Sequence, residues 1–146
     1  MTNPIQIAQE RFAQGFSCSQ SVFSAYASQL GIDDETALKL ASPFGGGTAH
    51  QGYVCGAVTG ALMALGMARG SASLDKKDET YRIAEDLIKR FRKIHGTILC
   101  HELIDCDIST PEGLQEAREQ KVFVSACPGF VKDAAELAAE FLDEQK

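Results

Sequence analysis

The segment around Cys55 restricts the possible fold more than any other part of this sequence. Residues 51–68 carry no charged side chain, and small residues recur at every fourth position, at Gly52, Gly56, Gly60, Ala64 and Ala68. On an α-helix, positions four apart form one row, so this row would carry almost no side chains. Each glycine inside a helix costs roughly 1 kcal/mol relative to alanine. We therefore predict a helix over about 53–69 that another helix, or a ligand, approaches closely near Cys55.

The rest of the chain has the periodicity of helices rather than strands. Apolar residues spaced by three and four, together with capping residues and glycine stops, predict the other helices. They cover about 4–15, 17–30, 34–42, 75–95, 110–119 and 129–142, with a short turn near 100–104. Residues 122–124 are too short an apolar run to indicate a sheet. We expect an all-α fold, a compact bundle of about five principal helices plus short ones without a sheet, with 1–146 forming a single helical four-cysteine domain.

Charge and hydropathy limit the binding partners and the cellular compartment that this sequence is expected to have. The net charge of −6 argues against a nucleic-acid backbone or an anionic membrane as partner. As a helix, the uncharged segment 51–68 would span about 27 Å, but its Gly, Thr and Ala content favours a buried helix over a membrane span. The N-terminus lacks the features of a signal peptide, so we expect a cytoplasmic protein with reduced thiols. The uncharged helix could also form the face of a homodimer.

The positions of the five cysteines are more informative than their spacing. Cys18, Cys55, Cys100 and Cys127 each fall at or near the predicted start of a helix. Free N–H groups at a helix start favour thiolate, which predicts lowered thiol pKa values and a place where an anionic cluster is stabilised. Cys106 differs, because its carboxylate neighbours Asp105 and Asp107 disfavour thiolate.

The spacing itself matches no standard site. There is no Cys-x-x-Cys pair, and Cys100 and Cys106 do not reproduce a ferredoxin run. The glycines at 45–47 lack the lysine of a phosphate-binding loop, so a flexible connection that lets backbone approach the cysteines is favoured. His50 is a candidate ligand or proton donor, whereas a solvent-facing position is favoured for His101.

Several segments together resemble one known family. They are Gly15-Phe-Ser-Cys-Ser-Gln20, Phe44-Gly-Gly-Gly47, Cys55-Gly-Ala-Val-Thr-Gly60, Cys100-His-Glu-Leu103 and Cys127-Pro128 before an alanine-rich helix. In this order they are similar to the C_GCAxxG_C_C family of small redox-active proteins. The resemblance implies that Cys18, Cys55, Cys100 and Cys127 are the characteristic four and that Cys106 is an extra. A related module occurs in a cytochrome-type protein with an iron–sulfur centre, but this chain has no Cys-x-x-Cys-His for covalent haem.

Three functional hypotheses follow. In the first, the four cysteines converge to bind an iron–sulfur cluster for electron transfer or redox sensing, with Gly56 and Gly60 allowing close approach. In the second, the same cysteines form reversible disulfides without metal. In the third, they hold structural zinc, or nothing, on a helical interaction module. The sequence defines no reaction or substrate, and it leaves the redox partner unknown.

Overall fold

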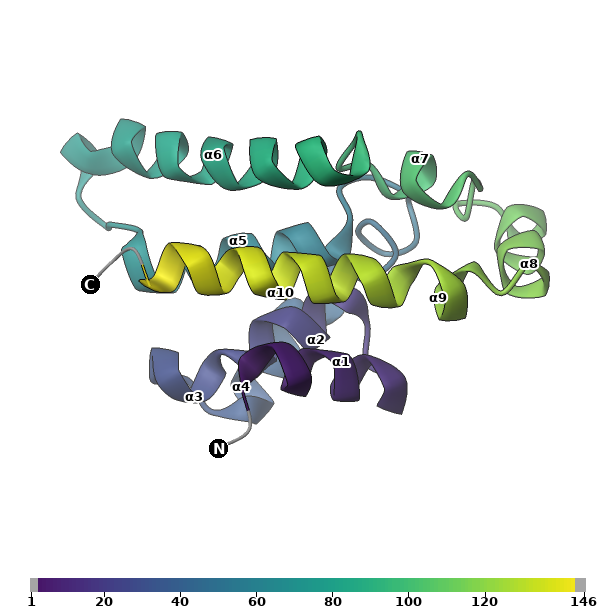
Figure 1. Cartoon of the computed structure of the whole chain (residues 1–146), viewed down its shortest axis with the longest axis horizontal. Coiled ribbons are helices and arrows are strands. Elements are labelled where there is room, and N and C mark those ends of the chain that lie inside the picture. The colour runs from purple at the N-terminus through teal and green to yellow at the C-terminus, as the bar shows by residue number, and fades with distance from the viewer. Residues whose placement is uncertain (1–2, 144–146) are drawn as a thin grey trace.

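The computed structural model describes residues 3–143 and consists of helices and connecting loops (Figure 1). The α-helices are α1 (Pro4–Gln14), α2 (Cys18–Ala25), α3 (Ala27–Leu30), α4 (Asp34–Ala41), α5 (Gly56–Arg69), α6 (Lys77–His95), α7 (Cys100–Ile104), α8 (Pro111–Glu119), α9 (Val122–Ser125) and α10 (Cys127–Asp143). Two 3₁₀ turns, η1 (Ser42–Phe44) and η2 (Leu74–Lys76), complete the set. The all-α prediction is confirmed, although about five principal helices is a loose count.

The uncharged helix α5 lies at the centre of the bundle. It packs against α2 on one side and against α10 and α6 on others, and in Figure 1 α6 and α10 run beside it above the group α1–α4. Its buried positions are mostly small, with Ala57, Ala61 and Ala64 fully buried. Small side chains let neighbouring backbones approach closely, which explains why this helix tolerates its glycines. Among the described helices, none is long and apolar enough to span a membrane.

Local signals set most helix boundaries as predicted. The Asn3 side chain accepts a hydrogen bond from the Gln6 N–H, and Gly15 ends α1 with φ of 111°. Ser17 and Gln20 form a reciprocal capping box at the start of α2. These bonds satisfy N–H groups that have no partner inside the helix, so the position of Cys18 is fixed by its neighbours on both sides.

The predicted helix over 17–30 is interrupted at Tyr26. Its backbone forms a turn between α2 and α3, and its buried hydroxyl donates a 2.6 Å hydrogen bond to the carbonyl of Ala135 in α10. The interruption coincides with this tertiary contact, whereas local periodicity favours one continuous helix. Burial is also the main reason that the pKa of the Tyr26 hydroxyl is raised.

The second half of the chain returns to the central helix. The long amphipathic α6 buries Leu87 and Phe91, and at its end His95 contacts Asp133 of α10 at 2.8 Å. Residues 122–125 form the helical turn α9 and not a strand. The last helix, α10, begins at Cys127. The path from α7 to α9 thus returns the chain to the end of the bundle where Cys18 and Cys55 lie.

Candidate four-cysteine redox site

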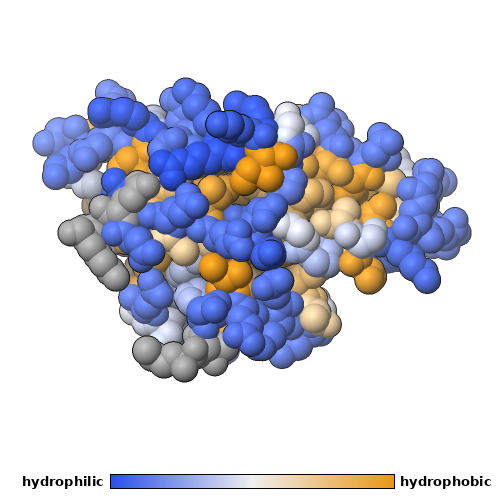
Figure 2. Space-filling model, viewed as in Figure 1, coloured by the Kyte–Doolittle hydropathy of each residue, from blue (hydrophilic) through white to orange (hydrophobic). Residues whose placement is uncertain are grey.

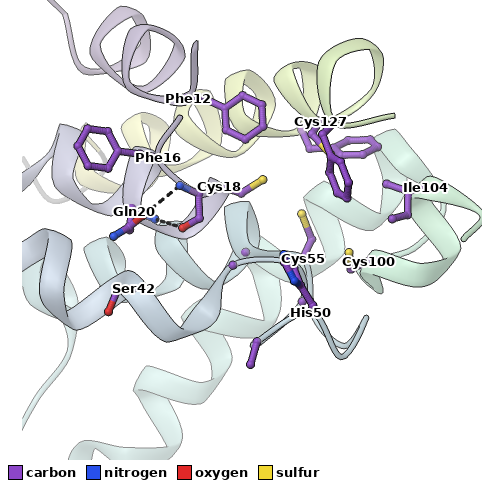
Figure 3. A pocket seen from close by; sticks show the side chains of 18 of the residues that line it. Phe12, Phe16, Cys18, Gln20, Ser42, His50, Cys55, Cys100, Ile104 and Cys127 are labelled. Carbon is purple, nitrogen blue, oxygen red and sulfur yellow. Dashed lines mark hydrogen bonds between the residues drawn. The ribbon is translucent and has the colours of Figure 1, made fainter. Parts of the chain in front are cut away.

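The four predicted cysteines lie around one cavity of about 670 Å³ (Figure 3). Cys55, Cys100 and Cys127 are buried, and Cys18 is partly exposed. They come from the starts of four helices, α2, α5, α7 and α10. The convergence that the sequence could only suggest is therefore a property of the fold.

The start of α5 places Cys55 next to α2. Cys55 is the residue that precedes the first turn of α5, and Gly56 follows it. A Cβ at position 56 would lie 2.8 Å from the Phe44 carbonyl oxygen and 3.3 Å from the Cβ of Cys18. Only glycine leaves room for this approach, because the contact with the Phe44 carbonyl oxygen is shorter than a Cβ tolerates.

A short backbone pairing joins Cys55 to Cys100. Val54 and Leu99 form an isolated antiparallel bridge. The Cys55 N–H donates to the Ile98 carbonyl at 2.7 Å, and the Cys100 N–H donates to the Tyr53 carbonyl at 2.6 Å. Two segments far apart in the sequence are thereby held in register, which brings both thiols to the same side of the cavity.

The glycine-rich loop before Cys55 adopts a left-handed turn. Five consecutive residues from Gly46 to His50 have positive φ, including the non-glycine residues Thr48, Ala49 and His50. This conformation costs roughly 1 kcal/mol or more for each non-glycine residue. At Gly47 a Cβ would meet the Cβ of Cys100 at 2.7 Å, so this glycine lets the loop pass directly over that cysteine. The turn also brings His50 to the cavity.

Cys18 and Cys127 line the same cavity and shift each other's pKa in opposite directions. The neighbouring Cys18 thiol lowers the pKa of Cys127. The Cys127 side chain, burial and the other nearby thiols raise the pKa of Cys18 well above its ordinary value. Of these two thiols, Cys127 is therefore the one on which negative charge is favoured.

The other two thiols are held in the neutral form. Burial raises the pKa of Cys55 to about 11, although the N–H groups of Ala57 and Val58 act in the opposite direction. Burial, followed by the nearby Cys55 and Cys127, raises the pKa of Cys100 to about 12. The prediction that helix starts would lower all four pKa values is therefore wrong for Cys18, Cys55 and Cys100. The Cys127 side chain outweighs the helix start at Cys18, and burial outweighs it at Cys55 and Cys100.

Cys106 lies apart from the four. It does not line the cavity, and its thiol contacts the Gln120 side-chain oxygen at 3.9 Å. Burial raises its pKa, and the carboxylates of Glu116 and Asp105 add to the effect. Neighbouring carboxylates thus raise the pKa of Cys106 as predicted, but burial raises it more.

The remaining predicted site residues have different surroundings. Gly56 lines the cavity, whereas Gly60 faces α2, where a Cβ would lie 2.8 Å from the Ser19 carbonyl oxygen. His50 lines the cavity with an exposed side chain, and His101 is exposed outside it. Gly60 therefore shapes the site by bringing α2 close to α5 rather than by contacting the cavity.

Sequence reasoning missed the apolar part of the cavity. Its wall includes Phe12, Phe16, Leu103, Ile104, Phe123 and Phe130. Phe12 and Phe16 follow the helical spacing of α1, so the sequence assigns them to a core face. The tertiary packing of α1 beside the start of α2 places them at the cavity instead. The only signal in the sequence is their position just before the Ser17-Cys18 motif.

The four cavity cysteines do not form a site for a single metal ion. In the part of the chain that the structure describes, no three His, Cys, Asp or Glu side chains are arranged to hold a single ion. A tetrahedral zinc site with bonds of about 2.3 Å would need sulfurs roughly 3.8 Å apart. Four cysteine sulfurs are the usual ligands of iron–sulfur clusters, which space their ligands more widely. The four thiols are therefore of the donor type that such clusters take.

The fold and the site define a class of protein: an all-helical chain with four thiols, drawn from four helix starts, around one cavity. A family model described as "Putative redox-active protein (C_GCAxxG_C_C)" matches residues 16–141, and the chain belongs to this family. The match includes all four cavity cysteines. Neither the curated proteins nor the solved structures gave a match.

Proposed function

We propose that this redox-active protein binds an iron–sulfur cluster through Cys18, Cys55, Cys100 and Cys127 and acts in electron transfer or redox sensing. The observation that carries the proposal is the convergence of these four thiols, and not Cys106, around one cavity. A bound cluster would supply one-electron redox chemistry. The chain would hold it on four separate elements and shield it from water with the apolar wall.

The protonation of the thiols gives this proposal a chemical consequence. Ligation requires thiolates, yet burial keeps Cys55 and Cys100 protonated at neutral pH, with pKa values of about 11 and 12. Binding must therefore release protons, and we expect the cluster to be lost more readily as the pH falls. Electrostatic repulsion between the four thiolates would be relieved by the positive charge of the iron ions.

Anaerobic reconstitution with ferrous iron and sulfide tests the proposal. Cys55→Ser is expected to lose at least half of the iron and sulfide retained after desalting, with matching loss of visible absorption and EPR signal. Cys106→Ser is the matched control, because it removes a buried thiol outside the cavity. Circular dichroism establishes that both variants are folded. A wild-type protein that retains no iron, or equal losses in both variants, would contradict cluster binding.

A second function is favoured by the location of Cys18 and Cys127 on one cavity. Two thiols that share a cavity, one of them with a lowered pKa, are suited to reversible disulfide chemistry. The Cys127 thiolate would attack an external disulfide, and Cys18 would then displace the leaving thiolate. One protein S–S bond forms, and the external disulfide is reduced to two thiols by two electrons and two protons.

Thiol counting separates the two functions. After treatment of the metal-free protein with oxidised glutathione, peptide mass spectrometry should find a Cys18–Cys127 disulfide and three free thiols. Five free thiols after this treatment would exclude the disulfide function. Elemental analysis of the purified protein for zinc tests the remaining structural hypothesis, since a zinc site would also melt on chelation.

A further inference from the structure

The negative charge of this protein is concentrated at one end of the molecule. Residues 100–120, which include α7 and α8, contain six carboxylates and one cationic side chain, so they carry a formal charge of −5 out of −6 for the whole chain. In Figure 1, α8 lies at the end of the molecule beyond α7 and α9. The carboxylates are all on exposed residues, namely Glu102, Asp105, Asp107, Glu112, Glu116 and Glu119.

These six carboxylates have no cationic partner within the protein. In the part of the chain that the structure describes, none of them lies within 4.0 Å of a Lys or Arg nitrogen, whereas Glu85, Asp86 and Glu140 are paired with Lys89 or Arg90. Glu119 lies in the last turn of α8, where the helix dipole disfavours a negative charge. Contacts inside the fold therefore do not account for this concentration of charge.

Exposed apolar side chains lie beside the acidic helix. Val124 of α9 is 75% exposed, and its neighbours Val122 and Phe123 are only partly buried. Helix α8 packs mainly against α9, and Figure 2 shows the apolar group toward the α7 and α9 end next to hydrophilic residues. An apolar centre with a charged rim is the arrangement of a protein–protein interface.

This surface is continuous with the four-cysteine cavity. Leu103 of α7 and Phe123 of α9 both line the cavity, and both side chains are partly exposed. Cys100 is the first residue of α7. A macromolecule seated on α7 and α9 would therefore cover residues that form the wall of the redox site.

We propose that the surface formed by α7, α8 and α9 docks a redox protein with a basic face. The apolar side chains around Val124 form the centre of the contact, and the carboxylates of α8 form its rim. Charge complementarity selects this partner, because the surface attracts a basic face and repels an acidic one. The assignment deepens the proposed function by naming the class of its redox partner, but docking itself requires no cluster.

Ferrocytochrome c, a small basic haem protein, is a suitable probe. In its reduced form it is diamagnetic and cannot oxidise the thiols. Anaerobic titration of the ¹⁵N-labelled full chain should give saturable amide shifts in α7–α9 and none at the start of α6. The affinity should fall at least tenfold between about 20 and 200 mM salt, because salt screens exposed charges. Reduced cytochrome b5, an acidic haem protein, should bind at least tenfold more weakly.

Removal of charge at two different places provides the decisive comparison. The double substitution Glu116→Gln and Glu119→Gln should weaken ferrocytochrome c binding at least threefold. The matched control, Asp78→Asn with Glu79→Gln, removes two exposed carboxylates at the start of α6, at the opposite end of the molecule in Figure 1, and should leave binding unchanged. Circular dichroism establishes that both variants are folded.

The apolar centre is tested in the same titration. Val124→Ser should weaken binding at least threefold, whereas Leu74→Ser, at an 89% exposed apolar residue of η2, should not. Both residues are exposed, so neither change removes a core contact. No saturable shifts in folded wild-type protein, shifts spread over the whole surface, equal binding of cytochrome b5, or equal effects of the α7–α9 and control variants would overturn the proposal.

This outcome is independent of cluster binding. Iron and sulfide retention measures the four-cysteine proposal, and the amide shifts measure the docking surface. Iron retention without ferrocytochrome c binding would reject the docking surface alone, and binding without iron retention would reject the cluster alone.

Discussion

Cys127 differs from the other cavity cysteines because its pKa is lowered rather than raised. The neighbouring thiol of Cys18, which is 109 positions away in the sequence, is the cause. Burial raises the pKa of both Cys55 and Cys100. Thiol chemistry at the scale of single residues is therefore set by which sulfur atoms meet, rather than by helix starts in general.

Alkylation at different pH values tests this assignment. In the metal-free protein, Cys127 should react with iodoacetamide at a lower pH than Cys55 and Cys100, because a lowered pKa leaves more thiolate as the pH falls. Cys18→Ala removes the neighbouring thiol that lowers the pKa of Cys127 and should shift the reactivity of Cys127 to higher pH. The rates are measured by peptide mass spectrometry. A profile for Cys127 that is unchanged by Cys18→Ala would contradict this role of Cys18.

At the scale of elements, the contact of α5 with α2 determines how closely Cys55 and Cys18 approach. Gly56 and Gly60 face the first turns of α2, whereas Gly66 of the same helix is exposed, with nothing within 4 Å of the position its Cβ would take. Packing against α2 therefore requires glycine at positions 56 and 60, but not at position 66. The fourfold spacing of small residues in the sequence indicated this packing.

Alanine substitutions in α5 should distinguish these glycines. Gly60→Ala is expected to destabilise the fold by about 1–3 kcal/mol, because its Cβ would meet the backbone of Ser19 and Phe23 at 2.8 and 3.2 Å. Gly66→Ala should stabilise it by up to about 1 kcal/mol through helix propensity. Urea denaturation gives both values. Equal effects of the two substitutions would mean that α2 does not constrain position 60.

The loop over 46–50 is the second element that sequence patterns did not predict in detail. The sequence favours a flexible connection, whereas the chain forms a left-handed turn with backbone hydrogen bonds such as Gly52 N–H to the Gly46 carbonyl at 3.1 Å. The predicted approach of backbone to the cysteines is present, since Gly47 passes over Cys100. The handedness depends on these longer-range bonds, which residue preferences alone do not specify.

At the scale of the whole molecule, the site joins helices from both ends of the chain. Cys18 and Cys127 belong to α2 and α10, and the Tyr26 hydroxyl joins the same two regions through the Ala135 carbonyl. Figure 2 shows that apolar surface is dispersed among hydrophilic residues on this face, with one group toward the α7 and α9 end. Because the four thiols come from four different helices, any group that they hold would connect elements that are otherwise joined by helix packing.

Reconstitution should consequently raise the stability of the entire fold. A ligand present at about 1,000 times its dissociation constant adds about 4 kcal/mol, or roughly 10 °C in the melting temperature of a chain of this size. Anaerobic thermal denaturation before and after iron and sulfide loading measures the change. Removal of the iron by a chelator should restore the lower melting temperature. Identical melting curves for loaded and unloaded protein would contradict ligation by all four helices.

The sequence by itself determined the helical class, most helix boundaries and the four cysteines, because capping residues, apolar periodicity and the motif around Cys55 are local signals. The tertiary structure decided that Cys18 and Cys127 meet at one cavity, that Cys55 and Cys100 stay protonated, and that Phe12 and Phe16 join the cavity wall. Each of these depends on side chains from distant elements meeting and on the water they exclude. Local patterns carry no information about such desolvation, so the pKa values and the extent of the cavity emerged only from the fold.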